Sequence, residues 1–172
     1  MLGKTHALCA VLLAAALGFS PLEAGIAAVF SLLPDADLPY SYMGRVFGPI
    51  ALAVNRKYGH RTVTHSLLSL GLVSAAALIL YFLGIIRLSF AEAVIVGYGS
   101  HIVLDLLNPT GIPLLWPKDL WFILLGGRIV VGELMEQVIF WLLLIGSLLY
   151  FGAECTGLTS FGFGGGLVGF CR

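Results

Sequence analysis

Residues 59–84 read "GHRTVTHSLLSLGLVSAAALILYFLG". From residue 64 onward this stretch is largely apolar, and it is long enough to cross a bilayer as an α-helix, which takes about 20 residues. His60, Arg61 and His65 stand where this helix would begin. Ionisable groups next to hydrocarbon are expensive to bury and are generally functional. The stretch therefore predicts a membrane helix that starts at a polar site.

The composition extends this interpretation to the whole chain of 172 residues. It is 59% hydrophobic and 10% charged, with a mean hydropathy of +1.02, whereas an ordinary soluble domain is about 25% charged. This number of polar residues is too small to cover the surface of a soluble fold. The bilayer must therefore be the solvent for much of the chain. The net charge is zero and no basic, aromatic-interleaved stretch occurs, which argues against nucleic-acid binding.

Five apolar segments predict an all-α membrane protein, a bundle of about five helices. They cover residues 6–19, 22–33, 64–84, 90–107 and 133–151. The first two are shorter than a bilayer requires, so we expect them to tilt or to form a hairpin that reaches only part of the way. Before the last helix we expect an irregular interfacial segment, which would suit Trp116 and Trp121. A single domain would then span residues 1–152, with a Gly-rich tail at 153–172.

The N-terminal run after Lys4 is similar to a secretory signal peptide, because one positive charge precedes an apolar stretch and small residues. Another apolar segment follows it directly, with no soluble domain in between. We therefore expect a retained first helix, in which Cys9 is a small core residue.

The polar residues fall at segment ends that a bundle would bring together. Helices with short connections alternate in direction, so the starts of odd segments and the ends of even segments share one face of the membrane. That face receives His6, Asp35, Asp37, His60, His65, His101, Asp105, Glu133 and Glu136. His101 and Asp105 are four residues apart and share a helix side. Asp35 and Asp37 follow a proline, in an expected extended turn that points both carboxylates at one centre. The pattern predicts a metal site.

Each of these residues also has a purely structural interpretation. A membrane histidine often only hydrogen-bonds a neighbouring helix, and "PDAD" at residues 34–37 can simply end a helix. These interpretations leave unexplained why no histidine lies outside the cluster. Imidazole and carboxylate without thiolate suit zinc, manganese, iron or nickel and disfavour calcium. We expect one or two divalent ions, with zinc as the first choice and manganese or iron as alternatives.

Lysine and arginine predict the orientation of the site. Seven of the nine fall on its face: Lys4, Arg45, Arg56, Lys57, Arg61, Lys118 and Arg128. The positive-inside rule then places the site at the cytoplasmic face of a prokaryotic inner membrane.

Arg61 is the candidate for binding an anionic substrate group, because guanidinium pairs bidentately with phosphate; an anchor to lipid headgroups is the alternative. The loop expected at residues 38–59, which contains Arg45, is a candidate for setting the substrate.

Four motifs resemble a known family. In order they read "THALCAVLLAAAL" (5–17), "SLLPDADLP" (31–39), "GHRTVTHSLL" (59–68) and "HIVLDLLNPTGIPLLWP" (101–117). Together they resemble the YdjM-like inner-membrane metal-dependent hydrolases, some of them described as LexA-regulated, over roughly residues 4–140. The resemblance implies functional residues at His6, Asp35, Asp37, His60, Arg61, Thr64, His65, His101 and Asp105. A "RIxxGxxxE" element adds Arg128, Gly132 and Glu136 and favours Glu136 over Glu133.

The activity that the resemblance implies is metal-dependent hydrolysis at the membrane surface. Metal would be held by residues among His6, Asp35, Asp37, His60, His65, His101 and Asp105. Asp37 or Glu136 would orient or deprotonate the water, and Arg61 would stabilise the developing charge. A site at headgroup depth favours a lipid-linked substrate, a phosphoester above all.

Two alternatives remain. One is a divalent-metal transporter, since transporters also bind their substrates between membrane helices. The other is a scaffold whose metal only joins helices.

Overall fold

The structure, a computed structural model, describes residues 1–155. These residues contain seven α-helices, two short 3₁₀ helices and one isolated β-bridge between Ile112 and Phe122. The α-helices are α1 (Gly3–Ala16), α2 (Pro21–Ser31), α3 (Tyr42–Phe47), α4 (Pro49–Tyr58), α5 (Leu67–Phe82), α6 (Leu88–Asp105) and α7 (Leu134–Cys155), and the 3₁₀ helices are η1 (Pro34–Asp37) and η2 (Val63–His65). The all-α prediction is confirmed. Most of the predicted Gly-rich tail, 156–172, lies outside the described residues.

The five predicted segments correspond to α1, α2, α5, α6 and α7, with ends that shift by a few residues. The loop predicted at 38–59 is wrong, because that stretch contains α3 and α4. Ser41 caps α3 by accepting a hydrogen bond from the Gly44 N–H at 2.8 Å, and Pro49 begins α4 at a position where its missing N–H is not needed. Between α6 and α7 the chain contains no helix, as predicted.

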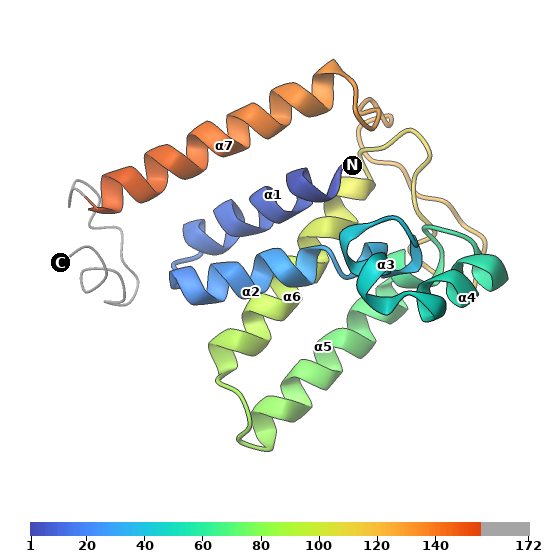
Figure 1. Ribbon diagram of the computed structural model, residues 1–172, viewed down its shortest axis with the longest axis horizontal. Coiled ribbons are helices and arrows are strands. Elements are labelled where there is room, and N and C mark those ends of the chain that lie inside the picture. Colours follow the sequence, from blue (N-terminus) through green and yellow to red (C-terminus); the bar gives the residue numbers. More distant parts are fainter. Residues whose placement is uncertain (156–172) are drawn as a thin grey trace.

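Helices α1 and α2 form a hairpin and lie side by side (Figure 1). The turn between them is set by a capping box, in which Ser20 and Glu23 satisfy each other's backbone N–H groups. Ala10, Ala14, Ala24, Ala27 and Ala93 make up the buried cluster between this hairpin and α6. Such small side chains let helix backbones approach closely.

The closest approach is between α2 and α6. A Cβ atom added at Gly97 would lie 2.2 Å from the carbonyl oxygen of Ala27, so only glycine fits there. Gly97 lies one helical turn before His101 in α6, and Ala27 lies one helical turn before Ser31 in α2. The contact therefore sets the distance between the two segments that carry the polar site.

Helices α5 and α6 form a second hairpin, and α7 lies along α1 (Figure 1). By length and apolarity, Leu88–Asp105 and Leu134–Ala153 are able to cross a membrane; the first is 50% buried inside the protein and the second 11%. Helices α1 and α2, of 14 and 11 residues, measure about 21 and 17 Å at 1.5 Å per residue. Both are shorter than the bilayer core of about 30 Å.

The starts of α1, α5 and α7 and the ends of α2 and α6 meet at one end of the bundle (Figure 1). The alternation of helix directions therefore brings together the segment ends that carry the polar residues.

Candidate metal centre

Five side chains from α1, η1, η2 and α6 converge at this end of the bundle: His6, Asp35, His65, His101 and Asp105. The Nε2 atom of His65 lies 3.4 Å from Asp105 Oδ2 and 3.6 Å from Asp35 Oδ1, and His6 Nε2 lies 3.4 Å from Asp105 Oδ1. His101 Nε2 lies 3.7 Å from both carboxylates. Ligands held about 2.1 Å from one ion are about 3.0–3.4 Å apart. The donor atoms thus have nearly the spacing of one coordination shell.

The imidazole of His101 has a defined tautomer. Its Nδ1 lies 2.6 Å from the carbonyl oxygen of Ser31, which can only accept, so Nδ1 carries the proton. Nε2 is then left with a lone pair that faces the centre. A metal-binding histidine is generally oriented by a second hydrogen bond of this kind.

The imidazole of His65 is oriented by a chain of two hydrogen bonds. The Thr64 hydroxyl donates to Asp37 Oδ2 at 2.9 Å, so its oxygen is left to accept from His65 Nδ1 at 3.0 Å. Nε2 of His65 is therefore also directed into the centre, where it lies 3.1 Å from His101 Nε2. Two lone pairs repel at this distance, so a cation must lie between the two nitrogens, either a proton or a metal ion.

Two other buried atoms favour the metal ion. His6 Nε2 has no hydrogen-bond partner among the described residues, and Asp105 Oδ2 has only ion-pair contacts, the shortest at 3.1 Å to Arg61 Nε, although both atoms are shielded from solvent. The other oxygen of Asp105 is already bonded to Asn108 Nδ2 at 2.6 Å and to the amino group of Met1 at 2.8 Å. One proton between His65 and His101 leaves His6 Nε2 without a partner, whereas a divalent ion would bind His6, His65, His101 and Asp105 together. The residues present therefore fit a metal ion.

The charges around the centre shift the protonation of two of its donors. Burial alone would lower the pKa of His65, but hydrogen bonds and charges from Asp105 and Asp35 raise it to about 8. Burial alone would raise the pKa of Asp35, but a hydrogen bond to His65 and the charges of the neighbouring histidines hold it well below its usual range. Without metal, the cluster at neutral pH is a protonated His65 held between carboxylates.

Asp37 and His60 lie beside this cluster and form a pair of their own. The His60 Nδ1–H group donates to Asp37 Oδ1 at 2.9 Å, and the backbone N–H of Arg61 donates to Oδ2 at 3.2 Å. The expected extended turn at Asp35 and Asp37 is instead the 3₁₀ helix η1. With three residues per turn, side chains two apart point roughly 120° away from each other. Asp35 therefore faces the donor cluster, while Asp37 faces His60 and Thr64.

Arg61 reaches the donor cluster from the same segment. Its Nε lies 3.1 Å from Asp105 Oδ2, and one of its terminal nitrogens donates to Thr110 at 2.8 Å. The backbone of Arg61 has φ +62°, a left-handed conformation that is unfavourable for a residue with a side chain. Such strain persists where the surroundings enforce it, commonly at functional sites.

Glu136, at the start of α7, is buried but does not face the donor cluster. Its Oε1 accepts hydrogen bonds from the Leu2 N–H and, at 3.0 Å, from the Thr5 hydroxyl; Oε2 accepts from the Gly132 N–H at 2.6 Å. Glu136 thus joins α7 to the first turn of α1, next to His6. Glu133 is exposed.

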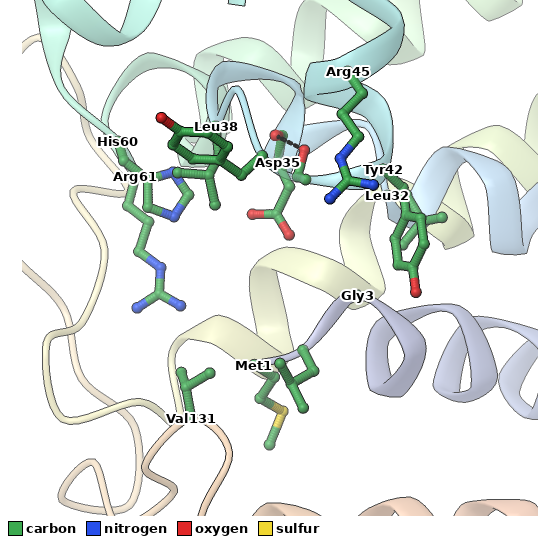
Figure 2. Close-up of a pocket in the computed structure, with 13 residues that line it drawn as sticks. Met1, Gly3, Leu32, Asp35, Leu38, Tyr42, Arg45, His60, Arg61 and Val131 are labelled. Carbon is green, nitrogen blue, oxygen red and sulfur yellow. Dashed lines mark hydrogen bonds between the residues drawn. The ribbon is translucent and has the colours of Figure 1, made fainter.

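A cavity of about 450 Å³ opens beside the cluster. Figure 2 shows Asp35 on its wall, with the guanidinium groups of Arg61 and Arg45 pointing into it from either side. His60, whose side chain is 28% exposed, lies on the same wall as Arg61. The apolar part of the lining includes Leu32, Leu38 and Val131. The donor cluster is therefore accessible from outside through Asp35.

Two functional groups were not predicted from the sequence. The Ser31 carbonyl, which orients His101, is a backbone atom and has no sequence signal. Asn108, which donates a hydrogen bond to Asp105, is not among the predicted site residues, although its position three residues after Asp105 is a usable hint.

The arrangement of motifs along the chain matches one protein family. The chain belongs to the YdjM inner membrane protein family. The sequence profile of that family matches residues 1–165, which confirms the resemblance. The YdjM family places the chain in the inner membrane, with the lipid bilayer around it.

Among individual YdjM relatives, the "Uncharacterized protein YvsG" of Bacillus subtilis (strain 168) is 32% identical over 159 residues, which are 88% of this chain and 94% of the relative. "Inner membrane protein YdjM" of Escherichia coli (strain K12) and of Shigella flexneri are each 40% identical over 91 residues. That alignment covers 50% of this chain and 44% of those two proteins, so it spans less than half of their length. No solved structure matches the chain.

Proposed function

We propose that the protein is a membrane-bound, metal-dependent hydrolase that cleaves an anionic ester in the cavity beside Asp35. The observation that carries this proposal is that Asp35 belongs to the buried donor cluster and also lines the cavity. A metal that only joined helices would be enclosed within the protein, whereas here one donor stands at an accessible surface. The cavity also contains positive charge for an anionic substrate.

The donor set supports a single ion. The two groups of potential ligands, His6–His101–Asp105 and Asp35–His65–His101, share His101. That residue has one ring nitrogen to give, because the other is bonded to Ser31. Three imidazoles and two carboxylates suit zinc first, with manganese and iron as alternatives. Such an ion supplies Lewis acidity, which makes water a nucleophile near neutral pH.

We assign the proton transfers to His60. Hydrolysis adds water across the ester bond, so one proton must leave the water and one must reach the departing alcohol oxygen. Asp37 holds the Nδ1 proton of His60, which leaves Nε2 to exchange protons on the cavity side. A histidine oriented by a carboxylate is a common general acid–base. In this proposal Asp37 positions both His60 and, through Thr64, the metal ligand His65.

Arg61 stabilises negative charge that develops at the cleaved group, since its guanidinium stands between the donor cluster and the cavity. Glu136 acts as a positioning residue, because all its hydrogen bonds are to the N-terminal segment and to Gly132. The excess of lysine and arginine at this end supports a cytoplasmic site. A site at the membrane surface supports a lipid-linked substrate, and we place phosphoesters first.

The test uses the full chain purified in dodecyl maltoside and reconstituted with zinc, manganese or iron. Metal content is measured by mass spectrometry, and turnover is measured on p-nitrophenyl phosphate, bis(p-nitrophenyl) phosphate and p-nitrophenyl acetate. We expect about one ion per chain and hydrolysis of at least one phosphoester. His65→Ala and Asp105→Ala should lose both metal and turnover, whereas His60→Ala should keep the metal and lose turnover.

Other results would favour the alternatives. Bound metal with no turnover on any ester, together with metal uptake into proteoliposomes, would replace the hydrolase by a transporter. Bound metal that neither turns over substrate nor exchanges with free metal would indicate a scaffold. A wild-type chain that stays metal-free after reconstitution would refute the metal site itself.

A further inference from the structure

The wall of the cavity opposite Arg61 carries a second guanidinium. Arg45 lies on α3 and points into the cavity on the other side of Asp35 (Figure 2). Within residues 1–155 its guanidinium has neither an ion-pair nor a hydrogen-bond partner. Arg61, by contrast, is already engaged with Asp105 and Thr110. The unused positive charge on this wall is therefore that of Arg45.

The position of Arg45 is tied to the metal donor itself. The Ser41 hydroxyl donates to the backbone oxygen of Asp35 at 2.6 Å and caps α3. At Gly44 the helix backbone packs against the Leu38 carbonyl so closely that a Cβ atom would lie 1.8 Å from that oxygen. The helix that carries Arg45 is thus fixed on the segment that carries Asp35, which places Arg45 beside the cavity.

The charge balance of the site fits an anion that carries more than one negative oxygen. Two carboxylates in the donor cluster, Asp35 and Asp105, offset a divalent ion, so the guanidinium groups of Arg61 and Arg45 remain as positive charges beside the cavity. An anion that contacts the ion therefore finds countercharge at both guanidinium groups, and that of Arg45 has no other partner within residues 1–155. Guanidinium binds phosphate oxygens in a bidentate manner, which a carboxylic ester cannot match. The apolar lining, Leu32, Leu38 and Val131, accommodates an alkyl group attached to that phosphate.

We infer that Arg45 is a specificity-determining residue that binds the phosphate group of an amphiphilic phosphoester, with the apolar part of the substrate against Leu32, Leu38 and Val131. This inference rests on the proposed hydrolase and names its substrate class. It also assigns a use to α3, which contributes no metal donor.

The test measures binding, so it does not depend on turnover. The zinc-loaded full chain in dodecyl maltoside is titrated with inorganic phosphate and with hexyl phosphate by isothermal calorimetry. Each methylene that leaves water should tighten binding by about fourfold, so hexyl phosphate should bind more tightly than phosphate. Arg45→Gln should weaken both ligands by at least about tenfold, as expected for a lost hydrogen bond between charged groups, and its zinc content should stay the same.

The matched control is Arg56→Gln on α4, which removes the same charge from an exposed position outside the cavity lining. It should bind both ligands like the wild type. Equal affinity of Arg45→Gln and wild type, or an equal loss in Arg45→Gln and Arg56→Gln, would overturn the assignment of Arg45 while leaving the hydrolase intact. Loss of zinc in Arg45→Gln would also overturn it, because α3 would then support the metal site. A wild type that binds zinc but no phosphate would refute the substrate class alone.

Discussion

The Nε2 atoms of His65 and His101 face each other at 3.1 Å in the buried end of the bundle. Both imidazoles use Nδ1 as a donor, His65 to Thr64 and His101 to the Ser31 carbonyl. A single cation must therefore lie between them, and either a proton or a metal ion fits this place.

Metal affinity should fall as the pH decreases. Because the pKa of His65 is raised to about 8 in the metal-free protein, metal binding below that pH must displace a proton. Affinity should then decrease by about tenfold for each pH unit below about 8 and level off above it. Zinc affinity measured against a competing chelator from pH 6 to 9 provides the test. A constant affinity between pH 6 and 8 would contradict it.

The hydroxyl of Thr64 should matter for metal binding although it does not face the metal centre. Thr64→Val removes the link between Asp37 and His65 and should lower zinc affinity by about 10–100-fold, the usual effect of losing a residue that orients a ligand. Thr64→Ser keeps the hydroxyl and should bind zinc normally. The control is Thr62→Val, which breaks only a bond to the Gly59 carbonyl. Equal zinc affinities in Thr64→Val and Thr62→Val would refute the relay.

The contact between α2 and α6 should be necessary for both stability and metal binding. Gly97→Ala places a Cβ atom against the Ala27 carbonyl, so the helices must separate, and Ser31 moves away from His101. We expect a loss of about 1–3 kcal/mol, typical of overpacking, together with reduced zinc content. Gly99→Ala has open space around the new atom and should keep both properties. Thermal unfolding in detergent and metal analysis measure the two effects, and similar behaviour of the two variants would contradict the prediction.

Glu136 should contribute to stability rather than to proton transfer. Glu136→Ala leaves the buried Thr5 hydroxyl and the partly buried Leu2 and Gly132 N–H groups without their acceptor, and a buried unsatisfied group costs about 1–3 kcal/mol. The unfolding temperature should fall clearly, while the pH profile of turnover in the remaining folded protein keeps its shape. Glu133→Ala, at an exposed position of the same segment, should change neither. A pH profile that loses its basic or acidic limb in Glu136→Ala would make Glu136 a proton-transfer residue.

The bundle and the convergence of its polar ends could be predicted from the order of the residues. Apolar segments that alternate in direction bring the starts of odd helices and the ends of even helices together, and this required no knowledge of packing. The place of His6, His65 and His101 in one cluster follows the same logic.

The different directions in which the Asp35 and Asp37 carboxylates point could not be predicted in this way. Whether Asp35 and Asp37 face one centre or two depends on η1 being a 3₁₀ helix, and that conformation is stabilised by contacts with residues far away in the chain, such as Thr64. Helices α3 and α4 were missed because each is short and begins at a single serine or proline, a signal that also fits a loop.

The attachment of α3 has a consequence for how such proteins diverge. It supplies part of the cavity wall and no metal donor, and its position depends on Ser41 and Gly44 rather than on its outward side chains. If the proposed function is correct, substitutions at Tyr42 and Arg45 should change what enters the cavity without changing the metal donors. On the proposed function, descendants of one ancestor would be able to acquire different substrates while keeping the same donor cluster.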